Sequence, residues 1–209
     1  MRRLTSISAA LLVIGMCMSA QAKTVNYSWE DGGTFLGTGT SNNTVTALNV
    51  TDQVYSGSKS LMLTDTTATA AYAYLAWVQG LNAGDTVTAS FWVYDTTPSG
   101  SPSGRIWGHY DDSATDPLVN NGSASGNNTY SGATDWTQLS YTWTVAAGHT
   151  GLVIENRIYS SGAPLPASIW VDDLSIAAPD AATVVLPTPE PATMALLGLG
   201  SMILIRRKK

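Results

Sequence analysis

Cysteine is nearly absent from this chain of 209 residues: Cys17 is the only one, and it lies in an apolar segment near the N-terminus. The body of the protein therefore has no residue for a disulfide, a thiol nucleophile or a cysteine-ligated zinc site. Thiol chemistry and cysteine-based metal binding are excluded as functions of the body.

Charge is also scarce, at 12% of residues against about 25% in a typical soluble domain. Residues 23–188 contain four basic and 14 acidic residues, a net charge of −10, and the other six basic residues lie at the two ends of the chain. Nucleic-acid binding needs clustered lysines and arginines, so this distribution argues against a nucleic-acid partner. It favours cations and neutral ligands over anionic polymers.

Helical periodicity is missing from the body, where no segment has a convincing 3.6-residue period. β-branched and aromatic residues dominate instead, with glycine, asparagine, aspartate and serine between the segments. The absence of self-similarity at 20–50 residues excludes a solenoid or propeller. We expect an all-β fold, a single jelly-roll β-sandwich over residues 23–177. The nine expected strands are 24–29, 44–51, 58–64, 71–79, 85–96, 105–111, 136–145, 151–159 and 168–176.

The N-terminus has the pattern of a secretory signal peptide over residues 1–22. Two arginines precede an apolar stretch at 9–18, and residues 20–22 (Ala-Gln-Ala) fit the small-x-small cleavage pattern. The stretch is too short for a membrane anchor. We expect signal peptidase to cut there and the mature chain to begin near Lys23.

The C-terminus has three parts in order: Pro189-Glu190-Pro191, an uncharged stretch at 192–205, and four basic residues. A helix of 14 residues is about 21 Å long, which is short of the ~30 Å hydrocarbon core. Its basic end should stay in the cytoplasm. We expect a short transmembrane helix that holds the chain transiently in the membrane, after a linker at 178–188.

This C-terminal segment closely resembles the PEP-CTERM sorting signal of Gram-negative bacteria, in the Pro-Glu-Pro triplet, the glycine-containing apolar stretch and the Arg/Lys terminus. The resemblance implies recognition by an exosortase, removal of the segment, and delivery to the cell envelope, outer surface or extracellular polysaccharide matrix. An ordinary C-terminal anchor helix is the alternative.

Five segments of the body resemble, in order, a carbohydrate-binding module of the family 4/9 type, a galactose-binding-like jelly roll. They are 29–32 (Trp-Glu-Asp-Gly), 55–61, 78–85, Trp136 with Leu139, and 170–174 (Trp-Val-Asp-Asp-Leu). The sequence departs from the pattern at 85–87, where many members have an aromatic residue, and region 97–135 matches little beyond one strand. The resemblance implies a polysaccharide or oligosaccharide ligand.

The last strand places Asp172 on the same side as Leu174 and Ile176, so its carboxylate should point inward or to the sheet edge. A buried carboxylate needs a partner, and calcium takes carboxylate and carbonyl oxygens. The family resemblance implies a structural Ca²⁺ that joins the first and last strands, with Glu30 and Asp172 as ligands and a backbone carbonyl around Lys59. The alternative is an aspartate bonded to loop amides without a metal.

Strand alternation places a set of aromatic and hydrogen-bonding side chains opposite the expected core. Pyranose C–H groups stack on aromatic rings, and sugar hydroxyls bind carboxylate, guanidinium and amide groups. The candidate sugar-binding residues are Trp77, Trp92, Tyr94, Trp107, His109, Glu155, Arg157 and Tyr159. They can form one platform only if their strands share a sheet. The alternative is that these rings are core residues, as most are in a cysteine-free sandwich.

Catalytic residues are few. A glycosidase needs two carboxylates at a set separation, and the body has only Glu30 and Glu155 as glutamates. His109 and His149 lack a nucleophile or metal motif. We therefore expect a non-catalytic, exported carbohydrate-binding protein. The alternatives are a matrix protein that binds no sugar and a small glycan hydrolase or lyase that uses Glu155 with Asp111.

Overall fold

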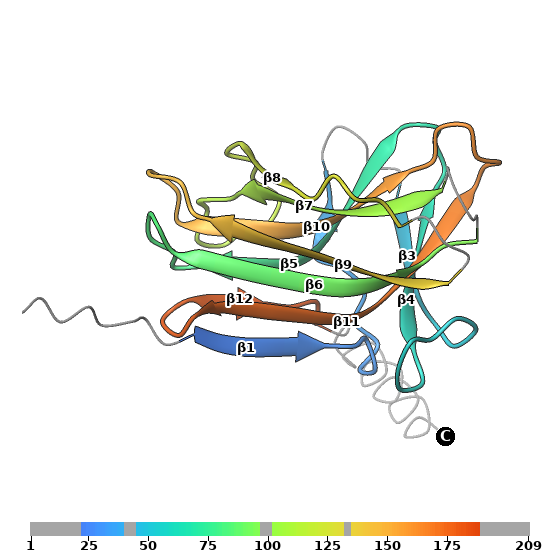
Figure 1. Cartoon of the computed structure of the whole chain (residues 1–209), viewed down its shortest axis with the longest axis horizontal. Helices are drawn as coiled ribbons and strands as arrows, with labels where there is room; N and C mark the ends of the chain where they lie inside the picture. The colour runs from blue at the N-terminus through green and yellow to red at the C-terminus, as the bar shows by residue number, and fades with distance from the viewer. Residues whose placement is uncertain (1–21, 40–44, 97–101, 132–134, 189–209) are drawn as a thin grey trace, which may run out of the picture.

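The structure, a computed structural model, describes residues 22–39, 45–96, 102–131 and 135–188 (Figure 1). These residues form twelve strands and no helix. The predicted signal peptide (apart from Ala22) and the Pro-Glu-Pro tail with its apolar helix lie outside the described residues. Within the described part, no helix has the length and apolar character needed to cross a membrane.

Sheet A is antiparallel and has β11 at its centre. Its strand order is β3 (Val45–Val50), β4 (Ser60–Asp65), β11 (Ala167–Pro179), β6 (Thr86–Tyr94) and β9 (Trp136–Thr144). β1 (Ala22–Tyr27) pairs with the C-terminal half of β11, and β4 pairs with its N-terminal half. Both strands lie on the same side of β11. The long β11 therefore ties the first strand to the middle of the sheet.

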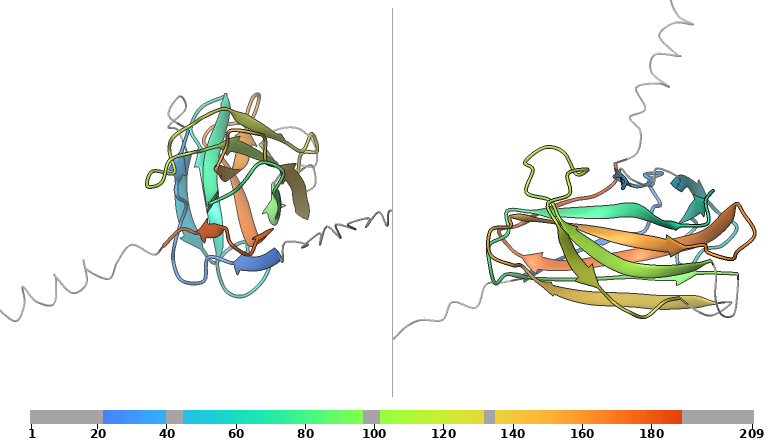
Figure 2. Two further views of the ribbon diagram at one scale, coloured as in Figure 1. Left: turned by 90° about the vertical axis from the view of Figure 1, so that its left-hand side faces the viewer. Right: turned by 90° about the horizontal axis from the view of Figure 1, so that it is seen from above.

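Sheet B is also antiparallel and lies against sheet A, as the two further views show (Figure 2). Its strand order is β12 (Thr183–Val185), β5 (Ala70–Gln79), β10 (Gly151–Tyr159), β7 (Ser103–Tyr110) and β8 (Ser123–Gly126). β2 (Gly37–Thr38) pairs with β5 beside β12. The two sheets confirm the predicted all-β sandwich of jelly-roll type.

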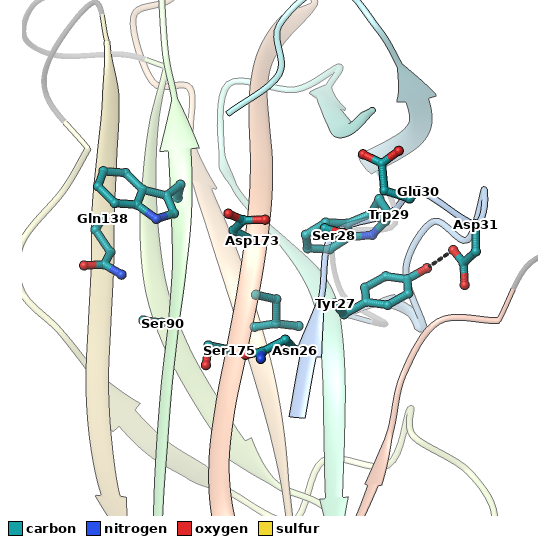
Figure 3. Close-up of a pocket in the computed structure, with 12 residues that line it drawn as sticks. Asn26, Tyr27, Ser28, Trp29, Glu30, Asp31, Ser90, Gln138, Asp173 and Ser175 are labelled. Carbon is teal, nitrogen blue, oxygen red and sulfur yellow. Dashed lines mark hydrogen bonds between the residues drawn. The ribbon is translucent and has the colours of Figure 1, made fainter. Parts of the chain in front are cut away.

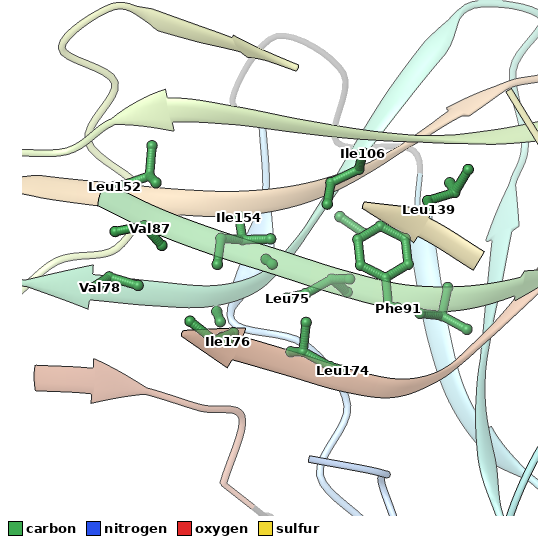
Figure 4. Packing of buried hydrophobic residues seen from close by; sticks show 14 of the residues in the cluster. Leu75, Val78, Val87, Phe91, Ile106, Leu139, Leu152, Ile154, Leu174 and Ile176 are labelled. Atoms are coloured by element: carbon green, nitrogen blue, oxygen red, sulfur yellow. The ribbon is translucent and has the colours of Figure 1, made fainter. Parts of the chain in front are cut away.

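The core lies between the sheets, where alternate residues of each strand point inward (Figure 4). On β6, Val87, Ala89, Phe91 and Val93 are fully buried, as the alternation predicted. Each large apolar side chain removed from water in this way contributes about 1.5–3 kcal/mol to folding. The intervening residues of β6 consequently point away from the core.

All nine predicted strands are present, and three short ones were missed. β2, β8 and β12 have two to four residues each, too few to show an alternating pattern. β12 corrects the predicted linker at 178–188, because its Thr-Val-Val sequence pairs with β5 and extends sheet B. The sandwich therefore continues to Val185.

Candidate functional site

The eight candidate residues for ligand binding lie on two different sheets. Trp92 and Tyr94 belong to β6 of sheet A, and the other six belong to β5, β7 and β10 of sheet B. Both sets point away from the core, so they lie on opposite outer faces of the sandwich. The condition for a single platform is not met, and each face is described separately below.

One half of the outer face of sheet B is covered. Trp77 and His109 are only 3% and 0% exposed. Leu36 and Val185 pack on the Trp77 cluster, and the Trp77 indole N–H donates to the carbonyl of Asp111 at 3.4 Å. The loop after β7 thus closes over this end of the face. Trp77 and His109 are structural here and are not accessible to a ligand.

A chain of hydrogen-bonded side chains leads from this covered half to the open half. His109 Nδ1 lies 2.5 Å from Glu155 Oε1, and Arg157 Nε donates to Glu155 Oε2 at 2.7 Å. The Glu155 side chain is 1% exposed, so its charge depends on these two partners. Burial, followed by the charge of Glu155, raises the pKa of the neighbouring Tyr74. Because Glu155 is buried and accepts the Nε–H of Arg157, it holds the Arg157 side chain in position.

The open half consists of aromatic rings alternating with guanidinium groups across three strands. The register places Arg157 opposite Tyr72 on β5 and opposite Arg105 on β7. The Arg157 guanidinium carbon lies 4.4 Å from the ring centroids of both Tyr72 and Trp107. Arg105 lies 4.4 Å from the Trp107 centroid and 5.3 Å from that of Tyr130. We call Tyr72, Arg157, Trp107, Arg105, Tyr130 and Tyr159 the aromatic–arginine face.

Local contacts hold this face in place. The Trp107 indole N–H donates to the Ser123 hydroxyl at 3.1 Å. Arg105 Nε donates to the carbonyl of Asn127, and an Nη1 atom lies 3.5 Å from the Tyr159 hydroxyl. Arg105 is only 9% exposed. The rings of Tyr72, Trp107 and Tyr159 are partly exposed, so they could contact a ligand from solvent.

Three members of the aromatic–arginine face were missed by sequence reasoning. Arg105 precedes Trp107 by two residues and shares its side of β7, so alternation could have found it. Tyr72 lies five residues before Trp77, so strict alternation places the two on opposite sides of β5. The register shift between β10 and β5 at Ile154/Glu155 brings both to the outer face. Tyr130 lies in a loop, where alternation carries no information.

The outer face of sheet A carries a second group of aromatic rings. Trp92 stacks on Tyr55, with centroids 4.1 Å apart and planes at 16°. Tyr94 contacts Trp136 and Trp170, at centroid distances of 5.6 Å and 5.7 Å. Tyr94 is thus held between neighbouring strands, whereas Trp92 borders a groove.

This groove, the sheet A groove, has a volume of about 630 Å³. In Figure 3 it extends from Gln138 of β9, across Asp173 and Ser175 of β11, to Tyr27 and Asp31 at the end of β1. Its lining residues are Asn26, Tyr27, Ser28, Trp29, Glu30, Asp31, Ser90, Trp92, Gln138, Asp173, Leu174 and Ser175. The lining combines short polar side chains, carboxylates and aromatic rings.

The predicted calcium ligand Glu30 already has hydrogen-bond donors. Its Oε1 accepts the amides of Ser58 at 2.8 Å and Lys59 at 3.0 Å, and its Oε2 accepts the Ser58 hydroxyl at 2.6 Å. These bonds, led by the Ser58 hydroxyl, lower the pKa of Glu30. The Lys59 ammonium donates to the Glu30 carbonyl at 3.1 Å, which places a positive charge where a cation would bind.

Asp172 is fully buried, but on the outer side of sheet A rather than on the side of Leu174 and Ile176 as alternation predicted. It pairs with the outward Trp92, because the register of β11 shifts after Asp172, and it faces amides of the covering loop. Its Oδ2 accepts the amides of Tyr55 and Ser56 at 3.0 and 3.1 Å, and its Oδ1 accepts that of Asp173 at 2.8 Å. Burial raises its pKa against the effect of these bonds. No group of three or more potential metal ligands occurs in the described residues. In this arrangement the donor set does not fit calcium, which stays a sequence-based prediction.

Two family models match the chain. Residues 21–158 match the model described as a carbohydrate binding domain, and residues 187–209 match that of the PEP-CTERM protein-sorting motif. A search among curated proteins finds no match. The first match covers most of both sheets, and the second covers the C-terminal tail.

Solved structures with a similar fold include a xylan-binding domain. The CBM22-1 xylan-binding domain of Paenibacillus barcinonensis Xyn10C is 18% identical, with a TM-score of 0.50 over 75% of this chain and 94% of that one. The CBM22-1–GH10 modules of Clostridium thermocellum Xyn10B, complexed with xylohexaose, are 18% identical, with a TM-score of 0.49 over 73% of this chain and 28% of that one. At these identities the likeness concerns the fold alone.

Proposed function

Because the chain belongs to the carbohydrate binding domain family, we propose that it is an exported surface protein that binds polysaccharide without cleaving it. The PEP-CTERM motif at 187–209 is a signal for export and sorting to the cell surface. Signal peptidase and exosortase would process the two ends, and the mature protein would reside at the outer surface or in the extracellular matrix of a Gram-negative bacterium.

The aromatic–arginine face is the proposed site, and the position of Arg157 is the observation that carries it. Its guanidinium lies 4.4 Å from the rings of Tyr72 and Trp107, and its side chain is 17% exposed. Only its Nε is bonded within the described residues, to Glu155. The two Nη groups are therefore free to donate to sugar hydroxyls while the adjacent rings contact pyranose C–H groups.

The hydrogen-bonded chain behind this face supports the proposal because it orders the site before binding. Glu155 is held by His109 on one side and holds Arg157 on the other. A side chain that is already ordered loses less conformational freedom on binding, which favours affinity. The same arrangement would keep the donor groups of Arg157 in one direction and thereby favour particular hydroxyl geometries.

A role in binding rather than cleavage is supported by the state of the two glutamates in the body. Glu30 accepts bonds from Ser58 and Lys59, and Glu155 is shared between His109 and Arg157. A glycosidase needs one carboxylic acid and one carboxylate beside the scissile bond. Here Glu30 is bonded to the loop at Ser58 and Lys59, and Glu155 is bonded to His109 and Arg157. Both glutamates thus have structural partners, which supports a role in binding.

The test is affinity electrophoresis of the full chain, in a zwitterionic detergent, through gels that contain xylan, β-glucan, mannan or polygalacturonate. Xylan is included because the structurally similar Paenibacillus module is a xylan-binding domain. We expect retardation by at least one neutral polysaccharide. Trp107→Ala and Arg157→Gln should each weaken it about tenfold or more, as loss of a central aromatic or arginine contact does.

Leu48→Ala is the matched control, since Leu48 is a 57% exposed apolar residue outside both sites. It should be retarded like the wild type. Unchanged retardation of folded Trp107→Ala and Arg157→Gln would remove this face as the site. Absence of retardation by all four polymers would favour the matrix protein that binds no sugar.

A further inference from the structure

We propose that the sheet A groove is a second saccharide site, which takes an uncharged polysaccharide chain on the side of the sandwich opposite the aromatic–arginine face. The inference rests on the proposed function for its ligand class, but it uses none of the same residues. It would make one molecule of this protein bivalent for polysaccharide.

The floor of the groove is a row of small polar residues in register on three neighbouring strands. Ser175 of β11 pairs with Asn26 of β1 on one side and with Ser90 of β6 on the other. Serine side chains are short, whereas Trp92, two residues after Ser90 on β6, is a large side chain of the same lining. The resulting hollow of about 630 Å³ lies within the ~300–1,000 Å³ of typical ligand sites.

The backbone is unusual at two places along this groove. Trp29 and Asp173 have φ values of 60° and 47°, in the left-handed region that few residues other than glycine adopt. The register of β11 against β6 also shifts between Asp172 and Ser175. A bulge of this kind redirects side chains. Here it leaves Asp172 on the outer side opposite Trp92, beneath the amides of Tyr55 and Ser56, while Asp173 lines the groove. Strained backbone of this type gathers at binding sites.

The polar side chains of the groove are available for a ligand. Within the described residues, Asn26, Ser90, Gln138 and Ser175 make no side-chain hydrogen bond to another residue, and in Figure 3 no dashed line joins them to the other residues drawn. Asp173 uses Oδ1 for the Ser56 hydroxyl, at 2.7 Å, and keeps Oδ2 free. Sugar hydroxyls can replace water on all of these groups, and their bonds to the carboxylate are the stronger ones.

An aromatic wall completes the groove. Trp92 is half-buried and lines it, while one side of the indole is stacked on Tyr55. Tyr55 is 40% exposed and contacts Trp136 at a centroid distance of 5.6 Å. The stack holds the indole in one orientation, and an ordered ring with a polar floor beside it suits the apolar face and hydroxyl edge of a pyranose.

Charge selects the kind of saccharide. Glu30, Asp31 and Asp173 line the groove, and no lysine or arginine does. A uronate or sulfated sugar would be repelled by these carboxylates. An uncharged chain meets no such repulsion, so the ligand class is a neutral polysaccharide. With sites on both outer faces, one protein molecule could hold two chains and so cross-link them.

The test counts bound hexasaccharides per chain by isothermal titration calorimetry, with xylohexaose, cellohexaose and mannohexaose as probes and hexagalacturonate as the charged comparison. We expect two sites per wild-type chain for a neutral probe. Ser175→Tyr fills the floor of the groove without touching the core, and should leave one site. Thr144→Tyr, an exposed position of β9 outside the groove, is the matched control and should retain two.

A second measurement is light scattering with long, soluble arabinoxylan or β-glucan. The wild type and Thr144→Tyr should form cross-linked aggregates, whereas Ser175→Tyr and Trp107→Ala should bind without aggregation. The inference would be overturned if folded Ser175→Tyr still had two sites. It would also be overturned if the wild type had a single site that only Trp107→Ala abolished. A single site abolished only by Ser175→Tyr would instead overturn the aromatic–arginine face and keep the groove.

Discussion

On the outer face of sheet B the charged side chains are bound to one another, whereas in the sheet A groove several polar side chains have no partner in the described protein. His109, Glu155 and Arg157 form a continuous chain on sheet B. Ser90 and Ser175 have only solvent to bind on sheet A. Both faces carry aromatic rings. The comparison teaches that similar residue types can form two kinds of surface. In one, buried partners hold the side chains in place before any ligand binds, and in the other the polar groups gain partners only when a ligand enters the groove.

The largest expected effect comes from breaking the buried chain on sheet B. Glu155→Ala leaves His109 and Arg157 without their shared partner, and we expect the free energy of unfolding to fall by about 3 kcal/mol. Asp173→Asn on sheet A should change it by less than about 1 kcal/mol, because that carboxylate is partly exposed. Urea denaturation of both variants measures the contrast. Equal losses would show that the two faces do not differ in this way.

A smaller effect should follow removal of the ring that supports the groove wall. Tyr55→Ala exposes one side of Trp92 and should destabilise the fold by about 1 kcal/mol. It should weaken neutral-hexasaccharide binding in the groove several-fold and leave the other site unchanged. Tyr130→Ala is the counterpart on sheet B, since Tyr130 is 43% exposed and packs on Tyr159 at 5.1 Å. Calorimetry that shows the same site weakened by both would contradict the separation of the faces.

Asp172, on the sheet A side, should make the stability of the fold depend on pH. Burial raises the pKa of Asp172 above its ordinary value of 3.8. The folded state therefore binds its proton more tightly than the unfolded state, and the resulting stability is present at low pH and is lost as the pH rises through the folded pKa. Asp172→Asn should show a smaller decline, because burial also raises the pKa of Asp111 on the sheet B side, which contributes the same trend. Urea midpoints measured upward from pH 3.5 test it, and parallel curves for the two proteins would contradict it.

The smallest expected effect is that of chelation. Since the carboxylates of Glu30 and Asp172 already accept amide and hydroxyl donors, EDTA should move the melting temperature by less than about 2 °C, or under about 1 kcal/mol. Differential scanning calorimetry with and without added calcium measures this. A rise of several degrees in the melting temperature with calcium would show that the folded state binds the ion. The amide and hydroxyl donors would then have to move away from the two carboxylates.

Much of the fold could be predicted from the sequence, because alternation is a local property. The core side of β6 follows from residues two apart, whereas the bulge in β11 places Asp172 on the side opposite to the one that alternation predicted. The candidate site was predicted less well. Trp77 lies on the outer face as predicted, yet it is covered by residues near 36, 111 and 185. His109 is buried beside Tyr74 and Glu155. No local pattern connects either residue with these neighbours.

The sequence by itself determined the C-terminal sorting motif, the all-β class and the inward or outward side of most strand residues, since each depends on local composition or spacing. Only the tertiary structure decided that Trp92 and Trp107 belong to opposite faces. That outcome depends on strand pairing, in which β6 lies between β11 and β9 while β7 lies between β10 and β8. Pairing is set by contacts between distant segments, and the bulge at Asp172–Ser175 and the groove beside it exist only once those strands have met.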